Sequence, residues 1–184
     1  MTDRVLVAGV GNIFLGDDGF GVEVARRLAS AGLPDWVRVA DYGTSGMHLA
    51  YDLAGGYGTA ILIDAAPRGG EPGTLTVLEV DREHRPELTA GDAAAGGPLQ
   101  GSRMFDAHGM QPDLVFGVLD MLGAETGRIL VLGCEPARLD HGIGLSEPVA
   151  AAVDEAMRIV KTLVAEGPEN APRPPSSGIV TDDR

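Results

Sequence analysis

The chain has 184 residues, which is the usual size of one domain and enough to bury a substantial core. Its 27 acidic residues outnumber its 14 basic residues, and the net charge of −13 disfavours binding to nucleic acid or to anionic membranes. The single cysteine, Cys134, excludes an intramolecular disulfide and a four-cysteine zinc site. The N-terminal residues resemble neither a signal peptide nor a membrane span, so we expect a cytoplasmic protein.

The first part of the chain alternates predicted strands and helices. Short apolar runs predict strands at Arg4–Val10, Val37–Tyr42 and Thr59–Asp64. Apolar residues at helical spacing predict helices at Phe20–Ala31 and Met47–Leu53. This alternation indicates a mostly parallel sheet with right-handed crossovers.

The next connection breaks this alternation. Ala65–Gly73 contains two prolines and three glycines and is too short for a crossover helix, so we expect the strand Thr74–Val80 to run antiparallel to its neighbour. The rest of the chain predicts a helix at Pro112–Leu122, a strand at Arg128–Cys134 and an amphipathic helix at Glu147–Glu166. The predicted fold is an α/β three-layer sandwich. Its five-stranded sheet is mostly parallel, with one antiparallel strand and helices on both faces.

We expect one α/β domain over residues 1–167. The Ala- and Gly-rich stretch Ala90–Gly101 is expected to be a mobile loop within it. The tail Pro168–Arg184 contains four prolines and few apolar residues, which predicts disorder.

The turn after the first strand begins like a dinucleotide-binding fingerprint. Residues 9–14 read GVGNIF, so Phe14 stands where the third glycine of G-x-G-x-x-G belongs. The acidic pair Asp17 and Asp18 would also repel a pyrophosphate, which disfavours a dinucleotide oxidoreductase. Each of the two acids has two interpretations. It caps the following helix, or it points across the strand ends as a ligand.

Asp64 closes the third predicted strand. In open α/β sheets, ligands bind beyond the carboxyl ends of the strands, at the switch point next to the first strand. If the strand order begins with the second, first and third strands, Asp64 lies beside the turn at residues 11–18. The alternative is that Asp64 only starts a turn, where Asp is common.

The four histidines have unequal claims to this edge of the sheet. His108 lies in a compact segment, residues 105–110, that can return to the same edge. His48 is expected to be exposed on a short helix, and His84 lies in a charged run typical of a solvated face. His141 lies in a glycine-rich turn that could border the site. Spacing alone does not choose among them.

Two carboxylates and one imidazole would make a three-ligand metal site with open positions, as in catalytic centres. These donors suit zinc, manganese or nickel, which can polarise a peptide carbonyl and lower the pKa of bound water. Nucleophilic chemistry has weaker support. Cys134 is expected to be a core residue, and the sequence contains neither a G-x-S-x-G elbow nor a P-loop.

Several motifs in a fixed order resemble those of the hydrogenase maturation proteases. The opening motif GVGNIFLGDDGFG at residues 9–21 is similar to the family's G-x-G-N, acidic pair and G-x-G. DYGTSGM at residues 41–47 is similar to its G-T-x-G loop, and Asp64 to its strand-end Asp. GCEP at residues 133–136 and GIGLS at residues 142–146 are similar to its late elements. The resemblance covers about residues 4–165.

The resemblance implies an endopeptidase that removes a C-terminal peptide from the large-subunit precursor of a nickel–iron hydrogenase. It also implies that Asp18, Asp64 and His108 form the catalytic and metal-binding trio. The implied metal is nickel carried by the precursor, with zinc or another divalent ion as the alternative. A non-cleaving assembly factor that binds a metal or the precursor on the same fold is the alternative function.

Overall fold

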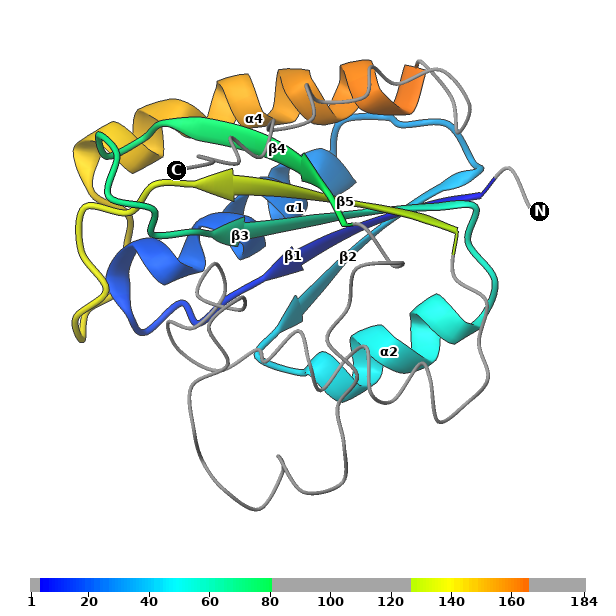
Figure 1. Ribbon diagram of the computed structural model, residues 1–184, viewed down its shortest axis with the longest axis horizontal. Helices are drawn as coiled ribbons and strands as arrows, with labels where there is room; N and C mark the ends of the chain where they lie inside the picture. The colour runs from blue at the N-terminus through cyan, green and yellow to red at the C-terminus, as the bar shows by residue number, and fades with distance from the viewer. Residues whose placement is uncertain (1–3, 81–126, 166–184) are drawn as a thin grey trace, which may run out of the picture.

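The computed structural model describes residues 4–80 and 127–165, drawn in colour in Figure 1. Every predicted strand in these ranges is present, with each end within one residue of its expected position. The elements, in chain order, are β1 (Val5–Val10), η1 (Gly16–Gly19), α1 (Phe20–Ala29), β2 (Val37–Gly43), α2 (Gly46–Ala54), β3 (Thr59–Ala65), β4 (Leu75–Glu79), β5 (Arg128–Cys134) and α4 (Glu147–Ala165).

The strands of the described ranges form one sheet in the order β2-β1-β3-β5-β4. The β1–β2, β1–β3 and β3–β5 pairs are parallel, and β4 pairs antiparallel with β5 at one edge (Figure 1). The predicted mixed sheet is therefore confirmed, and so is the order of its first three strands. Because β2, β1 and β3 run in the same direction, their carboxyl ends meet at one edge of the sheet.

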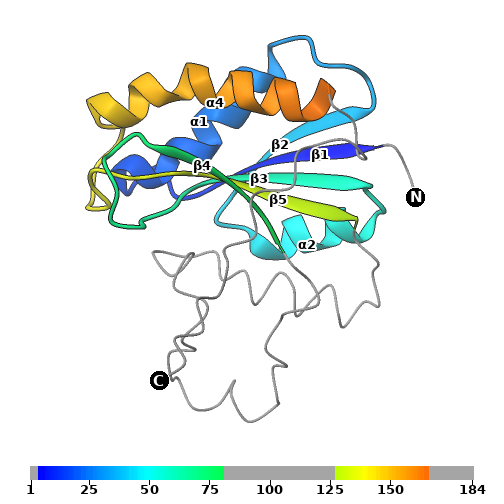
Figure 2. The same ribbon diagram turned by 45° about the horizontal axis from the view of Figure 1, so that its top comes forward.

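Helices cover both faces of this sheet, as predicted. Figure 2 shows α1 and α4 on one face and α2 on the other. Apolar side chains of α1 and α4 pack with those of β1, β3 and β5 in one core cluster, and α2 packs in a second cluster on the opposite face. All six residues of β1 are buried, which explains its uninterrupted apolar sequence.

Two glycines let α1 lie directly on the ends of the central strands. A Cβ atom on Gly21 would overlap the backbone oxygens of Val10 and Ile63, and one on Gly9 would come within 2.5 Å of Ala25 Cβ. The close approach brings the start of α1 and the η1 turn over the carboxyl ends of β1 and β3. The glycines of the opening motif therefore serve packing as well as turning.

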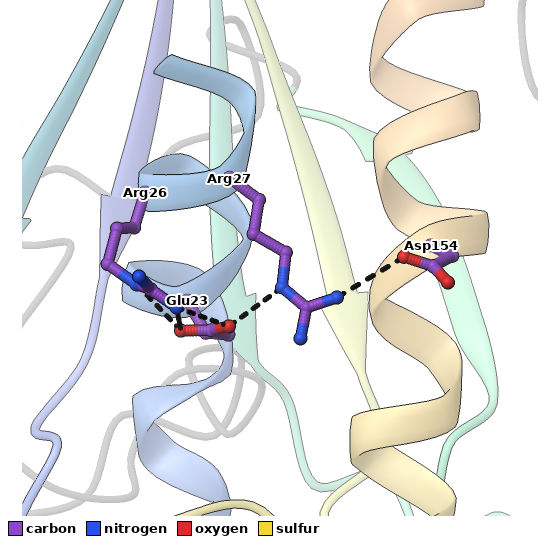
Figure 3. Close-up of polar contacts among 4 residues, drawn as sticks. All are labelled: Glu23, Arg26, Arg27 and Asp154. Atoms are coloured by element: carbon purple, nitrogen blue, oxygen red, sulfur yellow. Dashed lines mark hydrogen bonds and ion pairs between the residues drawn. The ribbon is translucent and has the colours of Figure 1, made fainter. Parts of the chain in front are cut away.

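α1 and α4 are also joined on their outer surface. Glu23 accepts hydrogen bonds from the guanidinium groups of Arg26 and Arg27, and Arg27 reaches across to Asp154 on α4 at 3.3 Å (Figure 3). Asp154 is largely exposed, so solvent and salt weaken this contact. The ion pairs supplement the apolar packing between the two helices and do not replace it.

α1 ends at Ala29, two residues earlier than predicted, because Ser30 and Ala31 donate to the carbonyls of Arg27 and Leu28 in a tightened final turn. The predicted helix Pro112–Leu122, the loop Ala90–Gly101 and the tail Pro168–Arg184 lie outside the described residues. Within residues 4–80 and 127–165, no helix combines the length and apolar character needed to span a membrane.

Candidate active site

Three segments meet at the carboxyl ends of the parallel strands. They are the turn after β1, the loop after β2 and the last residues of β3. Gly11 N–H donates to Gly43 O at 2.9 Å, which joins the first two segments. Gly11 has a φ of +123°, and a Cβ atom there would overlap the backbone oxygen of Asp18 and approach Asp64 Oδ1 to 3.6 Å. The turn thus brings Asp18 and Asp64 together around a position that only glycine can occupy.

Asp18 belongs to the short η1 turn and is almost fully buried, with 5% of its surface exposed. Its Oδ2 accepts a hydrogen bond from Asn12 N–H at 2.7 Å, so the opening turn holds the carboxylate. The N-cap of α1 is Gly19, and no side-chain cap hydrogen bond is present there. The helix-cap interpretation of Asp18 is therefore wrong, because η1 inserts a turn between the acidic pair and α1.

Asp64 ends the apolar run of β3 and is partly buried, with Oδ1 accepting from Ala65 N–H at 2.8 Å. Burial raises the pKa of Asp64 to about 8, and the nearby negative charge of Asp18 raises it further in the same direction. The charge of Asp18 therefore disfavours ionisation of both carboxylates together, and a bound cation relieves this kind of environment.

Asp17 points away from this pair, toward the loop that follows β5. It is completely buried and accepts hydrogen bonds from the backbone N–H groups of Ala137, Arg138 and Ser146, and from the Ser146 hydroxyl, at 2.6–2.9 Å. Burial alone would raise the pKa of Asp17, but these donors outweigh burial and lower it. The cap interpretation is wrong for Asp17 too. Its partners lie 120–129 residues away in the sequence.

The loop between β5 and α4 is bound to the opening turn along its backbone. Gly16 N–H donates to Gly142 O at 2.8 Å, and Gly142 N–H donates to Phe14 O at 2.9 Å. The buried Glu135 at the start of this loop accepts from the N–H groups of Arg68 and Gly69 and so holds the connection after β3. Sequence reasoning missed the role of Glu135. The only available signal was an acidic residue directly after an apolar strand.

The remaining candidate residues are the four histidines and Cys134. His48 and His141 are both exposed, and Cys134 is completely buried in the core as expected. His84 and His108 lie outside the described residues. Within residues 4–80 and 127–165, no group of three or more His, Cys, Asp or Glu side chains could hold a metal ion. The Asp18–Asp64 pair therefore supplies two oxygen-donor groups that need a further donor to complete a metal site.

The comparison with known proteins agrees with this geometry. A family model described as hydrogenase maturation protease matches residues 22–90. The hydrogenase expression/formation protein HupD of Rhizobium leguminosarum bv. viciae is 33% identical over 181 residues, which cover 94% of this chain and 83% of HupD. This chain belongs to the hydrogenase maturation protease family. The resemblance seen in the sequence motifs is confirmed.

Solved structures extend the likeness to the whole fold of this hydrogenase maturation protease. The hydrogenase maturating endopeptidase HybD from Escherichia coli is 30% identical with a TM-score of 0.68, and the match covers 89% of this chain and 93% of HybD. A hydrogenase 2 maturation peptidase from a Thaumarchaeota archaeon is 34% identical with a TM-score of 0.64, covering 88% and 98%. The fold and the protease class of the chain are thereby established.

Proposed function

We propose that this protease removes a C-terminal peptide from the nickel-loaded large-subunit precursor of a nickel–iron hydrogenase. The observation that carries the proposal is the pair of carboxylates at the carboxyl edge of the sheet, the buried Asp18 and the partly buried Asp64. The relatives support this partner, since they include a hydrogenase maturation protease and a hydrogenase maturating endopeptidase.

Asp18 and Asp64 fit a divalent metal ion chemically. Both offer carboxylate oxygens. Burial and then the charge of Asp18 raise the pKa of Asp64, and a cation that attracts both carboxylates would offset these two costs. We assign His108 as the third ligand on the family motif. The mixed oxygen and imidazole set suits nickel and also zinc. Nickel that arrives with the precursor is the metal we favour, because the protease would then cleave only a loaded precursor.

A metal held there would polarise the scissile carbonyl or lower the pKa of an attacking water. The contribution of the protein is to hold the two carboxylates in fixed positions. Asn12 N–H and Ala65 N–H each fix one carboxylate oxygen.

The same edge presents apolar surface that suits a polypeptide substrate. Ile13 and Phe14 on the opening turn are 45% and 59% exposed. Ile143 is 76% exposed and lies on the loop between β5 and α4, which we call the late loop. The hydrogen bond from Gly142 N–H to Phe14 O brings the two loops side by side. Large exposed apolar side chains next to a site favour docking of a protein partner.

The first experiment is intact mass spectrometry of a nickel-loaded large-subunit precursor, with and without this protease in substoichiometric amount. We expect the loss of one C-terminal peptide, and no loss from precursor prepared without nickel. An unchanged mass with verified nickel content, together with a stable stoichiometric complex, would instead support the non-cleaving assembly factor.

The assignment of the site is tested by substitution. Asp18→Ala, Asp64→Ala and His108→Ala should each abolish cleavage, because each removes a ligand of the same metal. The matched controls are Asp154→Ala on the outer face of α4 and His84→Ala, which should leave cleavage unchanged. Asp18→Asn and Asp64→Asn, checked by circular dichroism, separate loss of a ligand from loss of folding. Full activity in a folded Asp18 variant would falsify the metal trio.

A further inference from the structure

We propose that Asp17 and Ser146 are positioning residues that aim the Asp18 carboxylate at the metal. The inference rests on the proposed function, because it concerns the same site. It gives a role to two residues outside the proposed metal trio. The two carboxylates of the acidic pair then differ in role. Asp17 accepts hydrogen bonds from the late loop, and Asp18 is a ligand of the metal.

The first observation is the density of hydrogen bonds around Asp17. Its carboxylate accepts from Ser146 N–H at 2.6 Å and from the Ser146 hydroxyl at 2.9 Å, in addition to Ala137 N–H and Arg138 N–H. Its own backbone N–H donates to Arg138 O at 3.1 Å. Both the side chain and the backbone of Asp17 are therefore fixed to the late loop.

The second observation is that this anchoring is not needed to start α1. The N-cap residues of η1 and α1 are Leu15 and Gly19, and neither makes a side-chain cap hydrogen bond. Burying a carboxylate costs free energy unless donors compensate it, and here all the observed donors come from the late loop. The contacts thus fix the position of the η1 turn relative to the rest of the protein.

The geometry of a 3-10 turn transmits this restraint to the next residue. Successive side chains of such a turn point about 120° apart, so a fixed direction for Asp17 sets the direction of Asp18. The Asp18 carboxylate accepts a hydrogen bond from Asn12 N–H at 2.7 Å, and Asp18 and Asp64 lie on the same glycine, Gly11. Removing a group that orients a metal ligand without binding the metal typically lowers metal affinity by about 10–100-fold.

The test uses the Asn12 amide proton as a reporter of the Asp18 carboxylate. A short hydrogen bond to a carboxylate shifts an amide proton strongly downfield, and its resonance can be followed in ¹H–¹⁵N spectra of the full chain. We expect Asp17→Asn and Ser146→Ala to move this resonance upfield. Ser146→Thr, which keeps a hydroxyl, should leave the Asn12 amide resonance at its wild-type position. Titration of the same variants with Ni²⁺ alone should show affinity reduced about 10–100-fold for Asp17→Asn and less for Ser146→Ala.

A matched control distinguishes positioning from general stability. Glu135→Gln alters another buried carboxylate that accepts two backbone N–H groups, yet it holds Arg68 and Gly69 and not η1. We expect it to lower the melting temperature while the Asn12 resonance keeps its wild-type position. If Asp17→Asn does not fold, Ser146→Ala still tests the positioning role, because it removes one hydroxyl and keeps the backbone contacts.

The outcomes separate this inference from the proposed function. An Asn12 resonance that is unchanged in folded Asp17→Asn and Ser146→Ala overturns the positioning role, whatever the Ni²⁺ affinity of these variants. Wild-type Ni²⁺ affinity or full cleavage in Asp18→Ala overturns the metal trio instead. In that case the amide shifts still report whether Asp17 and Ser146 hold Asp18.

Discussion

At the scale of single residues, the pKa values of Asp17 and Asp64 are shifted in opposite directions because their surroundings differ. Asp17 is buried among hydrogen-bond donors that lower its pKa, whereas burial and the charge of Asp18 raise the pKa of Asp64 to about 8. Residue type and sequence neighbourhood are the same for Asp17 and Asp18. The partners that the fold supplies therefore decide what each of the two carboxylates binds, the late loop for Asp17 and Asn12 N–H for Asp18.

Cys134 should be chemically inert in the folded protein. Burial raises the pKa of its thiol to about 12, and the charges of Asp17 and Glu135 act in the same direction. At about pH 8 the thiol therefore stays protonated, and we expect no alkylation by iodoacetamide under native conditions. Mass spectrometry after unfolding in urea should show complete labelling. Rapid labelling of the native protein would contradict the burial of this residue.

At the scale of elements, the contact between α1 and the sheet is the least tolerant of change. We expect Gly21→Ala to destabilise the protein by about 3 kcal/mol, because its Cβ has no space between the backbones of β1 and β3. Urea unfolding measures the change. Gly32→Ala is the matched control. Its surroundings are open and its φ of +67° costs only about 1–2 kcal/mol. Equal losses in the two variants would contradict the close approach of α1.

The elements themselves were predictable, because they follow from local patterns. Apolar runs gave β1, β3 and β5, helical spacing gave α4, and the broken connection after Asp64 gave an antiparallel β4. The pairing of β4 with β5 could not be read in the same way, since it joins segments about 50 residues apart in the chain.

The site was predictable only in part. The meeting of the acidic turn and Asp64 was predictable because parallel strands bring their carboxyl ends to one edge. The choice of Asp18 over Asp17 came from the family motif and stays a prediction. The partners of Asp17 were not found, because Ser146 is 129 residues away and neither residue has a local pattern that points to the other. An Asp before a helix suggested a cap, and the insertion of η1 removed that possibility. The proposed role of His108 stays a prediction from the motif.

At the scale of the whole molecule, the net charge of −13 should make stability depend on salt. Like charges repel more in the compact state, and salt screens this repulsion. We expect the melting temperature at pH 7 to rise by about 2–4 °C between about 20 and 200 mM NaCl, which corresponds to about 1 kcal/mol. Near pH 4.5, where the net charge vanishes, the effect should disappear. A melting temperature that falls with salt at pH 7 would show that ion pairs such as Arg27–Asp154 dominate.

The place of β5 in the sheet has a consequence for the order of synthesis. β5 is the last strand among the described residues, yet it lies between β3 and β4, and the loop after it supplies every observed donor to Asp17. While the chain leaves the ribosome, β4 lacks its partner and the acidic turn lacks its support until about residue 146 has emerged. The nascent chain therefore completes this edge of the sheet only after the other described strands have been made, while α4 has still to emerge.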